Sequence, residues 1–254
     1  MRNKSVIALL LFFGWLMPLC SDAQQPSGPQ EQKLFDLTNQ ARSEHGAQLL
    51  VWDDALASAA KAHTQRMIDQ RTLSHQFQGE LDLPSRAGQA GAHFHEIAEN
   101  VAMGGNVDTL QKEWMNSTQH RTNILDPRLD HVGVSVMERA GYLYATVVFD
   151  TAVATMGVDQ TEQKIANLLR QRGVDPSRPA DAARKDCAVD SGDVSGSRPL
   201  FVMRWEGSDL NRLPDVLEQR LRSGRYKTAS VGTCAAGGTR NQGFTTYRIA
   251  VLLY

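Results

Sequence analysis

The chain has 254 residues, with 27 lysines and arginines against 28 aspartates and glutamates, so its formal net charge is −1. This balance, without a run of basic residues, argues against a nucleic-acid partner or an anionic membrane surface. The length is sufficient for one large domain or two modest ones.

The first 23 residues have the composition of a secretory signal peptide. Arg2 and Lys4 precede a 14-residue apolar run, Val6–Leu19, and Ser21-Asp22-Ala23 forms a small-x-small cleavage sequence. The run is short for a membrane span, although an uncleaved anchor is the alternative. A lipoprotein is disfavoured because a leucine, and not a small residue, precedes Cys20. We predict a cleaved signal peptide, a secreted or periplasmic location and no stable membrane span after cleavage.

Removal of the signal leaves two cysteines, Cys187 and Cys234. An even pair in an oxidising compartment is most simply one disulfide. Closing a loop of about 48 residues would stabilise the fold by roughly 3–4 kcal/mol in the chain-entropy model. Two reactive thiols are the alternative, but neither a neighbouring histidine nor a C-x-x-C spacing supports them.

A polar leader at residues 24–30 precedes two predicted helices. Apolar residues at helical spacing predict the first helix from Glu31 to Gly46, where the glycine ends it. The second helix follows Asp53, which is expected to be its N-cap. Residues 74–91 are rich in glycine and polar side chains and therefore predict a long loop.

Strand patterns complete the first half. A short apolar stretch at residues 97–103 predicts a strand, and Asp108, with Gln111 as its capping-box partner, opens a third helix. Alternating valines predict a strand at 132–136, and residues 142–149 form a second strand run. Antiparallel pairing of these strands, with helices covering both faces, would give an α+β fold of the α-β-α sandwich type.

The second half predicts a smaller β-α-β-β region. The expected elements are a helix at 160–172, an irregular segment at 173–196, a strand at 200–205, a helix at 210–222 and strands at 227–234 and 244–253.

The two halves show short local similarities. Glu31-Gln32-Lys33-Leu34 matches Glu162-Gln163-Lys164-Ile165, and Val132-Gly133 matches Val231-Gly232. One interpretation is a degenerate internal repeat; the other is that the β-α-β-β order is common and the matches are chance. The second half contains no histidine, so any polar site of the first half is not duplicated.

Four motifs in the first half carry a family resemblance. They are Leu56-x-x-x-Ala60-x-x-His63-x-x-x-Met67, Leu73-Ser74-His75, Ala98-Glu99-Asn100-Val101 and Trp114-Met115-Asn116-Ser117-x-x-His120-Arg121-x-Asn123-Ile124-Leu125. Together they cover about 120 residues. Their order and spacing resemble those of a bacterial CAP/SCP domain, of the superfamily that includes cysteine-rich secretory proteins, antigen 5 and pathogenesis-related proteins.

The resemblance implies a polar site at three positions. His75 and His120 match the two cleft histidines of the family, and Glu99 matches the glutamate of its G-E-N motif. Ser117 stands where many members have a second glutamate, and Ala98 replaces the usual glycine. The family's four-residue set is therefore incomplete here, with three of its members present.

Those three residues are compatible with more than one chemistry. Two imidazoles and one carboxylate, His75, His120 and Glu99, suffice as protein ligands for Zn²⁺ or another divalent cation, with water completing the shell. The same residues could instead act as a base–acid pair, with Glu99 orienting one imidazole. Without a metal, the carboxylate favours a protonated histidine. His63 lies on an apolar helix stripe and is expected to be a satisfied core histidine.

We therefore expect a CAP/SCP domain at residues 31–155 and a C-terminal region at 156–254. CAP domains are associated with lipid or sterol binding and with interactions outside the cell. The resemblance thus favours an exported binding protein for a lipid-like or cell-envelope ligand over an enzyme. The alternatives are a metal-dependent or general-base hydrolase that uses the same cleft, and a purely structural or interaction protein. The sequence leaves the oligomeric state open.

Overall fold

The computed structural model describes residues 25–234 and 244–254, and the predicted signal peptide lies outside them. Within the described part of the chain, no helix is both long and apolar enough to span a membrane.

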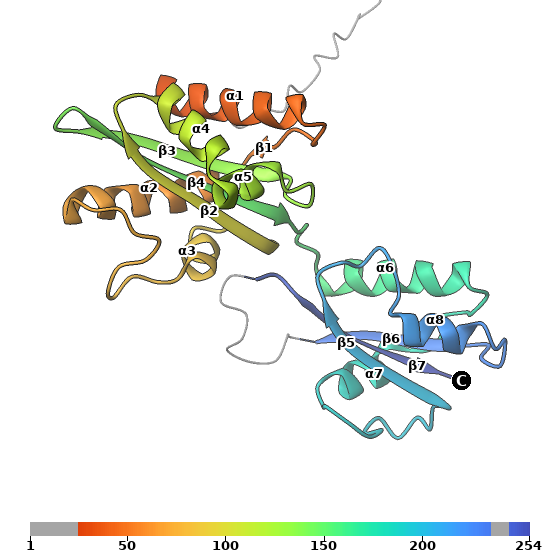
Figure 1. Ribbon diagram of the computed structural model, residues 1–254. Helices are drawn as coiled ribbons and strands as arrows, with labels where there is room; N and C mark the ends of the chain where they lie inside the picture. Colours follow the sequence, from red (N-terminus) through yellow and green to blue (C-terminus); the bar gives the residue numbers. More distant parts are fainter. Residues whose placement is uncertain (1–24, 235–243) are drawn as a thin grey trace, which may run out of the picture.

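The first half is built on a four-stranded sheet of order β1-β3-β4-β2 (Figure 1). Strands β2 (Phe94–Gly104) and β3 (His131–Arg139) each pair antiparallel with β4 (Tyr142–Ala152), which lies between them. The short β1 (Val51–Trp52) pairs parallel with β3. The predicted strands are confirmed, with β1 as an addition, because two residues are too short to show an alternating pattern.

Helices cover both faces of this sheet, as predicted (Figure 1). One face carries α1 (Pro29–Glu44), α4 (Val107–Asn116) and α5 (Thr118–Leu125); the other carries α2 (Asp54–Gln70) and α3 (Leu83–Gln89). Buried apolar side chains fill both layers, with separate clusters on the two faces of the sheet. The first half is therefore an α-β-α sandwich.

Helix α2 packs very closely on the sheet. Asp53 is its N-cap, as predicted, and accepts a hydrogen bond of 2.7 Å from the backbone nitrogen of Leu56. The first turn lies over Gly133 in β3, where a Cβ atom would be 2.0 Å from the backbone nitrogen of Ala57. Only glycine permits this approach.

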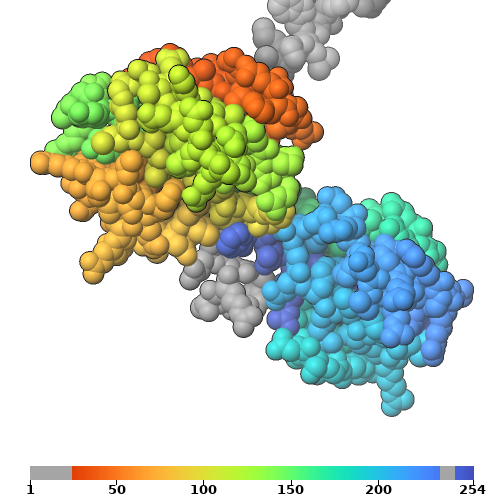
Figure 2. Space-filling model, viewed as in Figure 1, coloured from red at the N-terminus to blue at the C-terminus, as the bar shows by residue number. Residues whose placement is uncertain are grey.

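The second half forms its own three-stranded sheet of order β5-β7-β6. A separate hydrophobic core lies between this sheet and α6 and α8, and Figure 2 shows the two halves as two lobes. The elements are α6 (Val158–Gln171), α7 (Ala180–Cys187), β5 (Phe201–Gly207), α8 (Asp215–Leu221), β6 (Ala229–Cys234) and β7 (Tyr247–Leu253). The smaller β-α-β-β region is therefore present.

The two sheets share an arrangement. In each, a strand that precedes a helix and a strand that follows it both pair antiparallel with the last strand: β2 and β3 with β4, and β5 and β6 with β7. Gly232 in β6 lies under α7 as Gly133 lies under α2, since its Cβ would be 2.2 Å from the backbone nitrogen of Arg184. Glu31 and Glu162, at matching positions of α1 and α6, accept backbone hydrogen bonds from β3 and β6 respectively.

Segments distant in sequence connect the lobes. Phe244 forms a bridge with Phe94, the first residue of β2, and their ring centroids lie 5.1 Å apart. The backbone nitrogen of Thr245 donates to the carbonyl of Phe94. The Tyr247 hydroxyl donates to the carbonyl of Ala154, between β4 and α6.

Some local predictions were wrong. The segment predicted as a long loop contains α3, whose N-cap is Asp82. The N-cap of α4 is Asn106 and not Asp108, because the Asn106 side chain accepts the hydrogen bond from Thr109. Gln111 is no capping partner but faces α1.

The segment predicted to be irregular contains α7, which begins directly after Pro179. The disulfide between Cys187 and Cys234 is confirmed and joins the end of α7 to the end of β6.

Candidate functional site

The first contact of the polar site joins His75 to Glu99. Glu99 projects from β2, and its side chain is almost fully buried. His75 lies in the loop after α2 with a side chain that is 56% exposed, and its Nδ1 is 2.9 Å from Oε1 of Glu99. A buried carboxylate thus holds one nitrogen of an imidazole whose other nitrogen is free to face a ligand.

The other oxygen of Glu99 is also engaged. Arg86, on the short helix α3, donates from Nη2 to Oε2 of Glu99 and from Nη1 to the carbonyl of His75 at 3.0 Å. Arg86 is itself buried. It therefore fixes both the carboxylate and the loop that carries the imidazole.

His120 reaches the site from α5. Asn100, next to Glu99 in β2, donates to the carbonyl of His120 at 3.1 Å. Asn123, one turn further along α5, donates to the Asn100 side chain and to the carbonyl of Glu99. These two amides hold the helix against the strand. No hydrogen bond of the His120 ring is found among the described residues.

The two imidazoles have opposite shifts. The hydrogen bond to Glu99 raises the pKa of His75 above its ordinary value. Partial burial, with repulsion from His75, lowers the pKa of His120. The site thus favours a charged imidazole beside a neutral one, a combination that suits proton transfer or polar ligand binding.

The donor set fits a divalent cation only in part. Both Glu99 oxygens have partners, and among the described residues the three predicted ligands do not form a group whose donor atoms all lie within 4.8 Å of one another. The atoms that remain available to coordinate a metal are Nε2 of His75 and the ring nitrogens of His120. Glu99 is positioned to orient His75, as carboxylates orient metal-binding histidines in other proteins.

A buried network supports the site from beneath. His63, on α2, is fully buried, with Nδ1 2.8 Å from Oε1 of Glu80 and Nε2 2.8 Å from the carbonyl of Ser74. The prediction of a satisfied core histidine is confirmed. Glu80 and Arg86 were missed in the sequence, although Asp82 followed by Pro84 is a helix-start signature that could have revealed α3.

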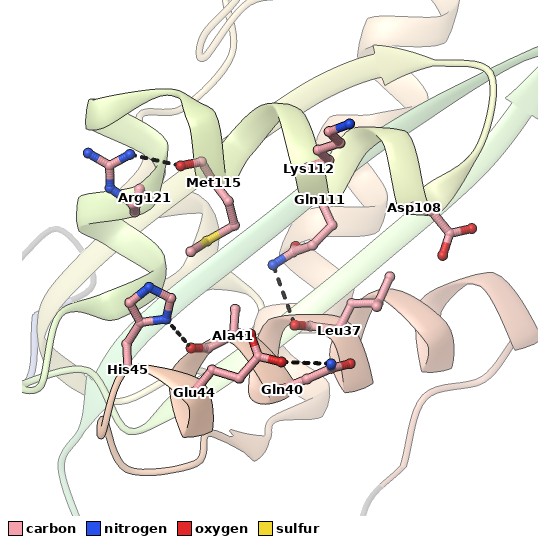
Figure 3. Close-up of a pocket in the computed structure, with 10 residues that line it drawn as sticks. All are labelled: Leu37, Gln40, Ala41, Glu44, His45, Asp108, Gln111, Lys112, Met115 and Arg121. Carbon is pink, nitrogen blue, oxygen red and sulfur yellow. Dashed lines mark hydrogen bonds between the residues drawn. The ribbon is translucent and has the colours of Figure 1, made fainter.

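A groove lies on the opposite face of the sheet, between α1 and the pair α4 and α5, with a volume of about 600 Å³. Figure 3 shows Met115 and Gln111 of α4 directed toward α1, where Leu37 and Ala41 face them. The rim is polar and consists of Gln40, Glu44, His45, Asp108, Lys112 and Arg121. The groove thus combines an apolar floor with charged edges.

Comparison with known proteins identifies the first half. The model of the cysteine-rich secretory protein family (CAP) matches residues 35–150. The uncharacterized Bacillus subtilis protein YkwD is 34% identical over 112 residues, which make up 42% of each chain. The uncharacterized membrane protein YlbC of the same organism is 32% identical over 108 residues, 42% of this chain and 31% of that protein. The chain thus spans less than half the length of these relatives.

Solved structures align over the same half. An extracellular SCP-domain protein from Bacillus anthracis is 29% identical, with a TM-score of 0.44, over 50% of this chain and 45% of that one. An outer surface protein from Borrelia burgdorferi is 19% identical, with a TM-score of 0.46, over 51% of this chain and 98% of that one. The family match and the sequence identity to YkwD therefore both concern the first half, where residues 35–150 are similar to the cysteine-rich secretory protein (CAP) family.

Proposed function

We propose that this CAP domain is a binding module for an amphiphilic, lipid-like ligand, which it holds in the groove between α1 and α4–α5. The volume of the groove is within the range of small-molecule sites. Its floor of Leu37, Ala41 and Met115 suits an acyl chain. Lys112 and Arg121 at the edge have no ion pair within the described residues, so they are available to an anionic head group. This pairing of apolar floor and free cations carries the proposal.

The head-group contact can be tested with Lys112→Glu. Lys112 is exposed and makes no ion pair with any of the residues that the structure describes, so the variant should keep the melting temperature of the parent. Its affinity for a fluorescent fatty acid, measured by titration, should fall several-fold because attraction becomes repulsion. Lys61→Glu, an exposed site outside the groove with the same charge change, is the matched control. Equal fatty-acid affinity in the two variants would contradict binding of the ligand in the groove.

The length of the acyl chain tests the floor in the same assay. Each buried methylene contributes about 0.8 kcal/mol. Removing two methylenes should therefore weaken binding by about tenfold. An affinity that does not depend on chain length would place the ligand elsewhere.

Export of the chain is part of this proposal. The n-region, apolar run and cleavage sequence of residues 1–23 support it, and so does the disulfide between Cys187 and Cys234, since such bonds persist in oxidising compartments. The ligand is then expected outside the cytoplasm, in the cell envelope or beyond it.

His75 and His120 would contribute a second binding feature. Their free ring nitrogens are suited to a divalent cation such as Zn²⁺, with Glu99 orienting His75 and water completing the coordination. Neither histidine lines the amphiphile groove, so such a cation would be bound outside it.

A general-base hydrolase is the second candidate, and the contact between His75 and Glu99 favours it. A carboxylate that holds Nδ1 leaves Nε2 able to accept a proton from water or a substrate hydroxyl. This function predicts that Glu99→Gln and His75→Ala each abolish hydrolysis of an ester or peptide library by the purified protein, while Lys112→Glu has no effect. Activity that persists in both variants, or none in the parent, would exclude it.

We also propose that the second half, from about residue 156, is a degenerate CAP-like copy. The shared strand order, the glycine under the second helix and the glutamate bonded to the sheet support this origin. The copy carries no histidine and so retains the framework without the polar site.

A further inference from the structure

A second group of metal-ligand side chains lies where β3 begins and β4 ends. Asp130, His131 and Asp150 each offer one donor atom, and these atoms all lie within 4.8 Å of one another. The group shares no residue with the site around Glu99. It also differs from the set that the family resemblance implies.

The backbone fixes these three side chains in place. His131 and Asp150 are direct partners in the antiparallel pairing of β3 with β4, so their side chains lie on the same face of the sheet. The backbone nitrogen of Asp130 donates to the carbonyl of Asp150 at 2.9 Å. The carboxylate of Asp130 accepts from the backbone nitrogen of Ala152 at 2.9 Å and lies 2.7 Å from Nδ1 of His131. The group is therefore organised before any ligand arrives.

Asp150 is the unusual member, because its carboxylate is buried without a partner. The residue is 1% exposed, and Oδ1 makes no hydrogen bond. The charges that act on it, Asp53 and Asp130, are both negative, and burial with this repulsion raises its pKa to about 8. An unpaired buried carboxylate is costly, and native proteins normally compensate it with a hydrogen bond or a cation.

The other acids nearby are already satisfied. Asp53 caps α2, and Asp130 accepts from Ala152. Arg42, the cation whose charge reaches Asp130, donates to backbone carbonyls, including those of Ile124 and Leu129. Among the described residues, no lysine or arginine forms an ion pair with Asp150. The fold thus leaves a position for one positive charge next to this carboxylate.

We propose that Asp130, His131 and Asp150 bind a divalent transition-metal cation, with one nitrogen and two oxygens as protein ligands and water in the remaining positions. The imidazole distinguishes this set from the all-oxygen shells that Ca²⁺ and Mg²⁺ prefer. Mixed nitrogen and carboxylate donors suit Zn²⁺ or Mn²⁺. The partial exposure of Asp130 and His131 provides the entry path.

The test uses the full mature protein after removal of metal with a chelator. His75→Ala and His120→Ala are combined in the background, so that the other histidine site cannot contribute. Calorimetric titration with Zn²⁺ should still show one site. Asp150→Asn and His131→Gln should each weaken it by at least about tenfold, since even outer-shell changes cost ten- to a hundredfold. Asp53→Asn is the control: it makes the same charge change and preserves a good N-cap.

Thermal melts separate binding from folding. Zn²⁺ should raise the melting temperature of the background protein, and this rise should be lost in Asp150→Asn, which is expected to be folded because asparagine has nearly the same shape. Absorption bands of tetrahedral or five-coordinate Co²⁺ in the background protein, absent in His131→Gln, would confirm an imidazole ligand. Absence of Zn²⁺ binding in the background, or unchanged affinity in Asp150→Asn, would overturn the proposal and make Asp150 a buried neutral acid.

Discussion

Arg86 is the residue on which the polar site depends most. Its guanidinium is buried and contacts three features: the carboxylate of Glu99, the carbonyl of His75 and, at 3.6 Å, the carboxylate of Glu80. A buried cation that holds two buried anions cannot be removed without leaving charges uncompensated. Arg86 therefore positions His75, both through its backbone carbonyl and through Glu99.

We predict that Arg86→Gln lowers the free energy of unfolding by about 3–5 kcal/mol, the range found when one partner of a buried ion pair is lost. Arg66 is the matched control. It lies 3.9 Å from the same Glu80 but is half exposed, so Arg66→Gln should cost at most about 1 kcal/mol. Chemical denaturation of both variants checks the difference. Similar losses in the two would show that the buried network contributes little.

The sequence predicted part of this site. His75, Glu99 and His120 were selected by resemblance, and the structure places all three around the edge of β2. Arg86 and Glu80 were not selected, because their importance comes from burial and from partners distant in sequence: Glu99 is 13 positions from Arg86, and His63 is 17 positions from Glu80. Contacts between residues far apart in sequence cannot be predicted from their spacing, unless the residues also belong to a helix or strand with a recognisable apolar periodicity.

At the scale of elements, two glycines set how closely a helix can approach each sheet. Gly133 lies under α2 and Gly232 under α7, and in both cases a Cβ would fall within 2.2 Å of a helix backbone nitrogen. Backbone atoms cannot move aside as a flexible side chain can. Each helix would have to lift from its sheet to accommodate alanine.

We predict that Gly133→Ala and Gly232→Ala each destabilise the protein by about 3 kcal/mol or more, at or above the upper end of overpacking effects. Gly105→Ala is the control, because a Cβ there meets nothing within 4 Å. The midpoint of denaturant unfolding measures all three. If Gly232→Ala has no effect while Gly133→Ala does, the proposed equivalence of α7 and α2 fails.

Element prediction succeeded where apolar periodicity extends over several turns or strand positions. Helices α1, α2 and α6 and the long strands have that periodicity. Helices α3 and α7 have only 7 and 8 residues and begin next to Pro84 and Pro179 in segments rich in glycine and charge. Proline at the first turn is compatible with a helix, but its surroundings predicted a loop. Such short helices are stabilised mainly by tertiary packing against the rest of the protein. A local sequence pattern does not reveal that packing.

At the scale of the whole molecule, the lobes have separate cores yet share backbone contacts. Residues Phe244 and Thr245 extend the pairing at Phe94, and Tyr247 bonds to Ala154 in the connection between the lobes. These contacts attach the segment at the start of β7 to the first lobe. The two halves are thus linked both through the chain that joins β4 to α6 and through the segment that enters the last strand.

The central place of β7 in the second sheet has a consequence for biogenesis. Residues 247–253 separate β5 from β6, so neither outer strand has a neighbour until this stretch has been synthesised. A nascent chain therefore exposes two unsatisfied strand edges, which invite aggregation, while its first lobe can already collapse. The second lobe therefore completes its sheet only after β7 has been made, so its folding lags behind that of the first lobe.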